Sequence, residues 1–168
     1  MADSGKPQWR PMREVEIVAG TPPGGGLDRT ARALAGVIES RRLLEVPLKV
    51  VNIPGDGGRK AWAHVERQAG NPHVLAVSSP NLTTDRLVGI AAFDHAALTP
   101  LAILYNEYIA FIARADSAIR NSGDLLQQLS AGPGSVTVAL STALGNPNHI
   151  AAEMRRVLGE LGLLSGKG

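Results

Sequence analysis

Residues 15–38 read VEIVAGTPPGGGLDRTARALAGVI and predict a strand, a glycine-rich loop and a helix in direct succession. Residues 15–19 form an apolar run typical of a buried strand, and residues 22–26 hold the prolines and glycines of a loop. Apolar residues then recur at helical spacing from Leu27 to Ile38. Because the first turn of a helix leaves its backbone N–H groups without acceptors inside the helix, this unit predicts an anion site at the glycine loop.

The composition is that of a globular protein. Of the 168 residues, 44% are hydrophobic and 19% are charged. The 17 basic and 15 acidic residues are scattered and aromatics make up only 4%, so we expect no nucleic-acid partner. The absence of cysteine excludes disulfides and thiolate ligands, and the histidines show no metal-site spacing. No metal and no cofactor are therefore predicted.

The alternation of strand and helix continues along the first half of the chain. Residues 47–53 and 73–79 predict two further strands, and a helical pattern follows each of them. The connecting loops are glycine-rich at residues 54–58 and rich in hydroxyl and amide side chains at residues 78–84. This order predicts an α/β fold with a parallel sheet, whose loops meet at the carboxyl edge of the strands.

The second half predicts a smaller α/β pattern. Residues 100–105 and 108–114 predict two strands joined by a break too short for a crossover helix, so the chain forms a hairpin or, as we favour, crosses to a second sheet. Ser122 is the predicted cap of a helix, and residues 135–140 predict a strand that leads into the polar loop at residues 141–149. A sheet this small is marginal, so we expect an incomplete second lobe and a chain that ends within a domain.

These patterns predict a flexible N-terminus over residues 1–12, a first α/β lobe over 13–105 and a partial second α/β lobe over 106–168. Two such lobes would enclose a cleft. No apolar run reaches the roughly 20 residues that span a bilayer, and the polar start lacks the apolar core of a signal peptide. The protein is therefore cytosolic if this start is native, or the start replaces a processed or engineered segment.

The glycine loop matches neither common nucleotide-binding motif. Arg29 stands where a dinucleotide motif that starts at Gly24 needs glycine, and no Walker A lysine follows. A tight turn without a ligand is the alternative, but similar loops recur on the same predicted edge. We expect Asp28 in the first helical turn, where its charge favours the helix dipole. If Asp56 faces the site, it favours a ligand that also carries an amine or hydroxyl donor.

No catalytic set is evident, since the chain lacks a G-x-S-x-G nucleophile elbow and a grouped Ser/His/Asp set. The loops are typical of binding. One alternative is an α/β enzyme that acts on a phosphorylated or carboxylated metabolite through Ser79 or His149, although His149 is expected to be a helix-start residue. Another is a truncated, non-transporting homo-oligomer whose sheet edges are covered by a second copy.

Five motifs in order resemble the substrate-binding receptors of tripartite tricarboxylate transporters, the Bug receptor family. They are TPPGGGLDRTAR from residue 21, VVNIPGDGGRKAW from residue 50, LAVSSPNLTT from residue 75, LTPLAILYNEYIAFIARADS from residue 98 and VALSTALGNPNHIA from residue 138. The resemblance extends over residues 14–154. It implies a type II periplasmic binding-protein fold, in which two α/β lobes close about a hinge near residues 105–108 and enclose a carboxylated solute.

The resemblance also implies the site, in which main-chain groups and ordered waters at the first lobe largely hold a ligand carboxylate and the second lobe helps determine specificity. The implied first-lobe residues are Pro23, Gly24, Gly25, Gly26, Leu27, Gly55, Gly57, Gly58, Ser79, Pro80 and Asn81. The implied second-lobe residues are Ser141, Thr142, Gly145, Asn148 and His149. The implied partners are a small carboxylate and the membrane permease subunits, and the implied location is the periplasm. Family receptors continue beyond residue 168, so the chain is expected to hold roughly the first half of their fold.

Overall fold

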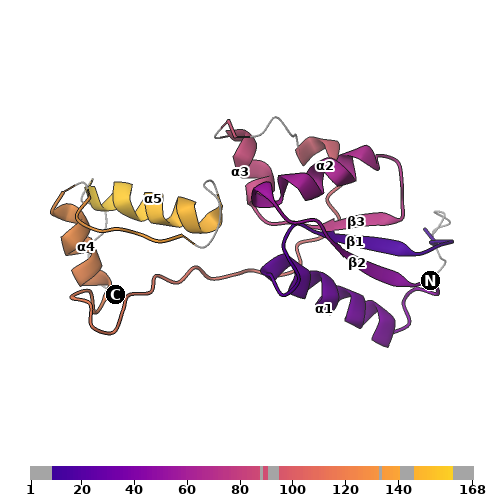
Figure 1. Ribbon diagram of the computed structural model, residues 1–168, viewed down its shortest axis with the longest axis horizontal. Helices are drawn as coiled ribbons and strands as arrows, with labels where there is room; N and C mark the ends of the chain where they lie inside the picture. Colours follow the sequence, from indigo (N-terminus) through magenta and orange to yellow (C-terminus); the bar gives the residue numbers. More distant parts are fainter. Residues whose placement is uncertain (1–8, 88, 91–94, 133, 141–145, 161–168) are drawn as a thin grey trace, which may run out of the picture. The chain divides into compact units, whose positions relative to one another are not determined.

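The computed structural model describes residues 9–87, 89–90, 95–132, 134–140 and 146–160. The chain divides between Thr99 and Pro100 into two compact units, which we call unit 1 and unit 2 (Figure 1). Each is described by itself. The boundary between a first and a second lobe at residues 105 and 106 stays a prediction.

Unit 1 is built on a parallel sheet of three strands. β1 (Val15–Ala19) lies in the centre, with β2 (Leu48–Asn52) on one side and β3 (Val74–Val77) on the other. The register places Ile17 opposite Val50 of β2 and Leu75 of β3. The three strands and their parallel arrangement are as predicted, so the α/β fold class is confirmed.

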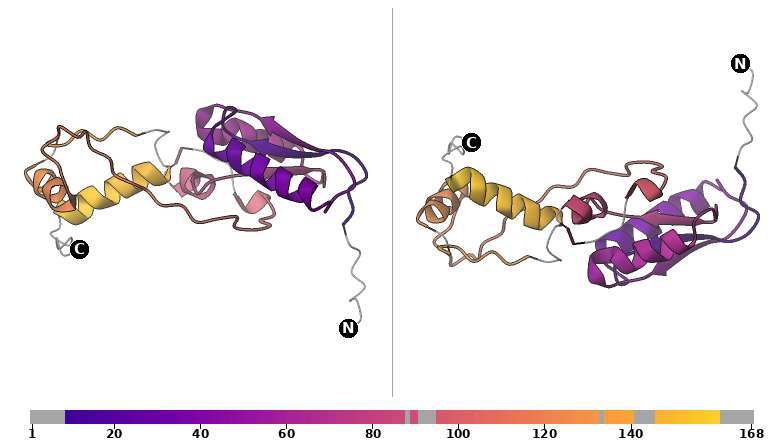
Figure 2. Two further views of the ribbon diagram at one scale, coloured as in Figure 1. Left: turned by 90° about the horizontal axis from the view of Figure 1, so that it is seen from below. Right: turned by 90° about the horizontal axis from the view of Figure 1, so that it is seen from above.

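Helices cover both faces of this sheet. α1 (Gly26–Ser40) lies on one face and α2 (Arg59–Arg67) on the other, as the opposite views of Figure 2 show. The 3-10 turn η1 (Asp56–Gly58) leads into α2; after β3 come α3 (Asn81–Leu87) and the 3-10 turn η2 (His95–Ala97). Because β1 is shielded on both faces, all of its apolar side chains are fully buried.

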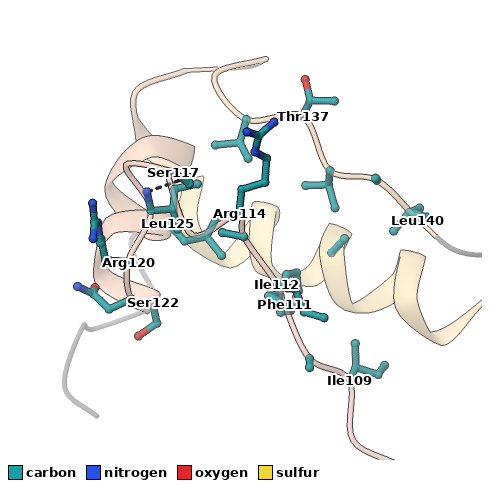
Figure 3. A pocket seen from close by; sticks show the side chains of 18 of the residues that line it. Ile109, Phe111, Ile112, Arg114, Ser117, Arg120, Ser122, Leu125, Thr137 and Leu140 are labelled. Atoms are coloured by element: carbon teal, nitrogen blue, oxygen red, sulfur yellow. Dashed lines mark hydrogen bonds between the residues drawn. The ribbon is translucent and has the colours of Figure 1, made fainter.

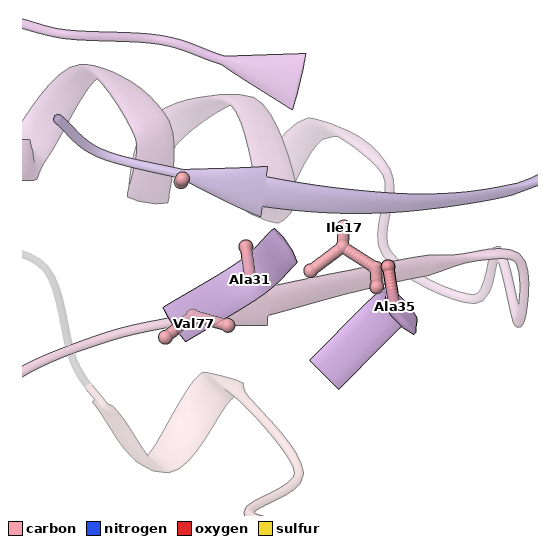
Figure 4. Packing of buried hydrophobic residues seen from close by; sticks show 5 residues of the cluster. Ile17, Ala31, Ala35 and Val77 are labelled. Carbon is pink, nitrogen blue, oxygen red and sulfur yellow. The ribbon is translucent and has the colours of Figure 1, made fainter. Parts of the chain in front are cut away.

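A small apolar cluster holds α1 against the sheet. Ile17, Ala19 and Val77 from the strands meet Ala31 and Ala35 from the helix (Figure 4). The two alanines lie one helical turn apart, so their small side chains let the helix approach the strands closely. Full burial of a side chain the size of Ile17 contributes roughly 1.5–3 kcal/mol to folding.

In unit 2 the described residues form two helices, α4 (Ser122–Ser130) and α5 (Pro147–Glu160), which pack against each other (Figure 1). The sequence predicted Ser122 as the cap of α4, and this prediction is wrong. The cap is Asn121, whose Oδ1 accepts a hydrogen bond from the N–H of Asp124 at 3.0 Å. Asp124 in turn accepts one from the N–H of Arg120 at 2.8 Å, so its side chain ties the residue before the cap to the first turn of the helix.

The strands predicted in unit 2 are wrong. Residues 100–105, 108–114 and 135–140 form neither strand nor helix, so neither the favoured crossing nor the alternative hairpin is built from them. A strand needs a neighbour to complete its ladder of hydrogen bonds, and no described segment of unit 2 pairs with these three. The apolar side chains of residues 101–114 are accordingly exposed; Ile103 is 89% exposed and Ile112 is 91% exposed.

Candidate anion-binding site

The loops that follow the three strands of unit 1 contact one another at one edge of the sheet. A Cβ on Gly20, just after β1, would lie 3.0 Å from the Cα of Gly58 in the loop after β2. The side chain of Asn81 joins the third loop to the second, because its Nδ2 donates a hydrogen bond to the carbonyl of Gly57 at 2.8 Å. The structure thus brings together the three loops that the sequence placed on one edge.

Part of the first loop has its backbone donors already occupied. The N–H of Gly24 donates to Oδ2 of Asp28 at 2.8 Å, and the N–H of Gly25 donates to the carbonyl of Pro22 at 2.9 Å. Pro23 has no N–H to offer. These three of the predicted contact residues are therefore poor candidates to donate a backbone hydrogen bond to a ligand.

The remaining donors of the loop lie at the start of α1. Gly26 and Leu27 are the first residues of the helix, where an N–H group has no acceptor within the helix. Gly25 occupies the cap position and has no side chain with which to cap them. Together with the positive end of the helix dipole, these N–H groups offer an anion a place to bind.

Asp28 lies buried beneath this loop, with 2% of its surface exposed. Its Oδ2 accepts hydrogen bonds from the N–H of Gly24 at 2.8 Å and from Nε of Arg32 at 3.1 Å, and its Oδ1 accepts one from Nδ2 of Asn52 at 2.9 Å. Asn52 Nδ2 also donates to the carbonyl of Thr21 at 2.9 Å, and Oγ1 of Thr21 accepts from the N–H of Asp28 at 3.1 Å. The cluster ties the first loop, α1 and the end of β2 together.

These donors lower the pKa of Asp28 to about 2 from its ordinary value of 3.8. The hydrogen bond from Arg32 has the largest effect, followed by those from Gly24 and Asn52, while burial acts in the opposite direction. Asp28 is therefore ionised at neutral pH, and its charge is matched by Arg32. The predicted place of Asp28 in the first helical turn is confirmed.

The second loop is held in a backbone conformation that favours glycine. Gly55, Asp56, Gly57 and Gly58 all have positive φ angles, of 118°, 53°, 63° and 96°. The carboxylate of Asp56 is 62% exposed, and its Oδ1 lies 3.5 Å from Nη1 of Arg59. The negative charge of Asp56, which disfavours an anion nearby, is thus partly balanced by Arg59, the first residue of α2.

Arg59 also lies beside a second carboxylate. Its Nε is 3.3 Å from Oδ2 of Asp85, a side chain that is 2% exposed. That oxygen accepts no hydrogen bond from the described residues, so the contact is an ion pair alone. Burial raises the pKa of Asp85, Arg59 opposes the rise and Asp56 adds to it. The pair joins α3 to the start of α2.

The polar side chains of the third loop are engaged within unit 1. Ser79 Oγ donates a hydrogen bond to Oδ1 of Asn81, which is 7% exposed. Ser78 Oγ accepts one from Nε1 of the buried Trp62 at 3.1 Å. Pro80, also expected at the site, is exposed just before α3. The loop is therefore pinned to α2 and to the second loop.

The second-lobe residues expected at the site are described only in part. Ser141, Thr142 and Gly145 lie outside the described residues. Asn148 and His149 lie in the first turn of α5, where both N–H groups donate to Oδ1 of Asn146, at 2.7 and 3.0 Å. The place of His149 at a helix start is confirmed, and its Nε2 lies 4.0 Å from Oε1 of Glu153.

Unit 2 contains a separate concavity of about 1050 Å³ (Figure 3). It is lined mainly by apolar side chains of the extended segments and of α4, among them Phe111, Val138 and Leu125, and Asn148 also lines it. Of the lining arginines, Arg114 is held by Asp116 at 2.6 Å. Its apolar lining is unlike a site for a small anion.

The described part of the chain shows neither a group of metal ligands nor a helix that could cross a membrane. No group of three or more His, Asp or Glu residues there could hold a metal ion. None of the described helices is both long enough and apolar enough to cross a bilayer.

Asn52 and Thr21 are residues of the site that the sequence did not single out. Their signal was position: Asn52 is the polar last residue of an otherwise largely apolar strand, and Thr21 directly follows the glycine after β1. A polar side chain at the carboxyl end of a parallel strand points to the edge where ligands bind in open α/β sheets.

No family model matches the chain. The chain is 26% identical to Protein BugT of Bordetella pertussis (strain Tohama I) over 150 residues, which cover 86% of this chain and 44% of BugT. Among solved structures, it is similar to a TctC solute binding protein from Polaromonas, determined without ligand, at 32% identity and a TM-score of 0.47. That match covers 51% of this chain and 29% of the other. The chain spans less than half the length of BugT. The similarity to BugT confirms the resemblance to Bug receptors.

Proposed function

We propose that this chain is part of an extracytoplasmic receptor that captures a small carboxylate, such as a dicarboxylate or tricarboxylate, and delivers it to a membrane permease. The observation that carries the proposal is the start of α1, where Gly26 and Leu27 directly follow the first of three connected loops and no side chain of the cap residue Gly25 covers their N–H groups. The similarity to BugT supports the receptor role. The Bug resemblance also favours a periplasmic location.

A ligand carboxylate at this place would accept hydrogen bonds from Gly26 and Leu27. Each hydrogen bond to a charged group contributes about 1.5–3 kcal/mol, and the dipole of α1 adds to the attraction. The N–H group of Gly57 in the second loop is the proposed contact for the rest of the ligand, because the N–H of Gly58 already donates to the carbonyl of Gly55 at 3.1 Å. A hinge near residues 105–108, as the Bug resemblance implies, is part of this proposal.

The proposed role is binding without turnover. Ser79, the nucleophile that an enzyme would use here, donates its hydroxyl hydrogen bond to the amide oxygen of Asn81. An amide oxygen is not a general base, so this contact does not activate the hydroxyl.

The test compares two glycines of the same helix. A Cβ added to Gly26 or to Gly36 meets no atom within 4 Å and both positions are exposed, so Gly26→Asp and Gly36→Asp form a matched pair. Titration calorimetry with citrate, tricarballylate, succinate and malate is expected to show binding of at least one compound to the wild type and to Gly36→Asp. Gly26→Asp places a negative charge at the proposed site and should weaken that binding by at least about tenfold.

Gly26→Asn separates charge from bulk, because its side chain has the same size as aspartate and no charge. We expect it to bind more weakly than the wild type and more tightly than Gly26→Asp. Equal binding by Gly26→Asp and Gly36→Asp would contradict a site at the start of α1. Gly25 is unsuitable for this test, because a Cβ there would lie 2.7 Å from Thr21.

A further inference from the structure

The carboxylate of Asp28 is surrounded by hydrogen-bond donors alone. In the described structure it accepts from the backbone of Gly24, the guanidinium of Arg32 and the side-chain amide of Asn52. These donors come from the loop, from α1 and from β2. A carboxylate can accept from all three, whereas an amide in its place must direct its own NH₂ group at one of them.

Gly24 is the residue on which this cluster acts most directly. Its φ of 81° lies in the region that favours glycine, and its N–H is turned inward to Asp28. Its carbonyl accepts a hydrogen bond from Nη1 of Arg29 at 2.7 Å. Gly24 therefore has both backbone groups fixed by α1, two residues before the helix begins.

We propose that Asp28 is a positioning residue of the anion site: by holding Gly24 and Asn52 it fixes the turn that leaves the N–H groups of Gly26 and Leu27 open to a ligand. This inference rests on the proposed function. Asp28 itself is buried and does not contact the ligand. The lowered pKa of Asp28 keeps its carboxylate charged at neutral pH, so its hydrogen bonds to the turn are present there.

The proposal predicts whether anion binding becomes stronger or weaker when Asp28 is changed. Asp28 carries a negative charge close to the bound anion, so removing that charge should strengthen anion binding if the charge were all that mattered. Loss of the turn should instead weaken binding, because the donors at the start of α1 are no longer held in place. Asp28→Asn distinguishes these two effects, since it removes the charge and keeps the size of the side chain.

The first measurement needs no ligand. In the wild-type chain the amide proton of Gly24 is expected to resonate downfield and to exchange slowly with solvent, because it donates to a carboxylate. Asp28→Asn should move this resonance upfield and speed its exchange by about tenfold or more. Glu39→Gln makes the same chemical change at an exposed position of α1 and should leave Gly24 unchanged.

The second measurement is calorimetry with citrate. Weakening by about tenfold in Asp28→Asn, with Glu39→Gln equal to the wild type, supports the proposal. Unchanged or stronger binding in Asp28→Asn overturns it, as does an unchanged Gly24 amide. If the wild type binds no carboxylate, the proposed function fails, and the Gly24 amide alone decides whether Asp28 holds the turn.

Asn52→Ala provides a second variant in case Asp28→Asn does not fold. It removes a neutral donor and keeps the carboxylate, so both effects should have the same direction and a smaller size. A Gly24 amide and a citrate affinity that are both unaffected by Asn52→Ala would count against the cluster as the element that positions the site.

Discussion

Units 1 and 2 carry the same kind of apolar strand pattern, and among the described residues only those of unit 1 form a sheet from it. Residues 15–19 lie between two parallel neighbours, and Ile17 is fully buried. Residues 108–114 are at least as apolar, yet no described segment pairs with them and Ile112 is 91% exposed. Strand propensity therefore selects suitable residues, whereas the neighbouring strands determine whether a strand forms.

Charged side chains differ between the units in the same way. In unit 1, Asp28 is buried against Arg32 one turn along α1, and Asp85 of α3 is buried against Arg59 of α2. In unit 2, Arg114 and Asp116 form an ion pair whose side chains are 84% and 68% exposed. Exposed pairs of this kind contribute little to stability, so the polar contacts of unit 1 are the ones that should respond to substitution.

The strongest test of this comparison is the same substitution in both units. Ile17→Ala removes a buried side chain from the cluster beneath α1 and should cost about 2–5 kcal/mol of unfolding free energy. Ile112→Ala removes an exposed one and should change it by less than about 0.5 kcal/mol. Urea unfolding followed by the fluorescence of the buried Trp62 and by circular dichroism measures both.

A similar loss for the two isoleucines would show that residues 108–114 are packed in solution. That result would break the comparison, because it would require a partner for this segment. Amide exchange over residues 108–114 gives an independent reading, since unpaired backbone should exchange far faster than β1.

The next largest effect concerns acid stability. The folded pKa of Asp28 is about 2 against an ordinary 3.8, so the ionised form favours folding. This stabilisation is fully present above about pH 4 and is lost as the pH falls towards about 2. Asp28→Asn should therefore lower the urea midpoint at neutral pH and flatten its decline over this range.

Asp116→Asn is the matched change in unit 2. The hydrogen bond from Arg114 lowers the pKa of Asp116 as well, but the pair is exposed to solvent and salt. We expect its midpoint and acid profile to stay close to those of the wild type. Equal acid profiles for wild type and Asp28→Asn would contradict the role given to the buried cluster.

The strands of unit 1 could be predicted from the sequence because local pattern and tertiary context agree there. Residues 15–19 were predicted with the observed bounds, and the glycine loop correctly marked the start of α1. The strands of unit 2 could not be predicted reliably, because their formation depends on hydrogen-bond partners that the pattern of residues 100–114 does not reveal.

The sequence predicted where the candidate site lies, but it did not predict which hydrogen bonds form there. Glycines and strand ends located the edge, but only the structure shows that the N–H of Gly24 donates to Asp28 and that of Gly25 to the carbonyl of Pro22. The contact from Asn52 to Asp28 spans 24 residues and has no local sequence signature. Such long-range hydrogen bonds depend on how the strands align.

A smaller effect is expected at the cap of α4. Asn121→Ala removes the acceptor of the Asp124 N–H and should destabilise the helix by about 1 kcal/mol. Because α4 packs only on α5 among the described elements of unit 2, the loss should appear as reduced local helicity, measured by the Cα chemical shifts of residues 122–130. A shift in the unfolding of Trp62 would instead show that the two units unfold together.

The smallest predicted effect is a gain in unit 1. Gly36 lies exposed within α1, and an added Cβ there meets no atom within 4 Å. Gly36→Ala should stabilise the helix by roughly 0.5–1 kcal/mol, since alanine loses less backbone entropy on folding. Because α1 packs on the sheet, this gain should raise the urea midpoint seen by Trp62. A rise in helicity without a change in that midpoint would mean that α1 unfolds separately from the sheet, which would remove the cooperativity that distinguishes unit 1 from unit 2.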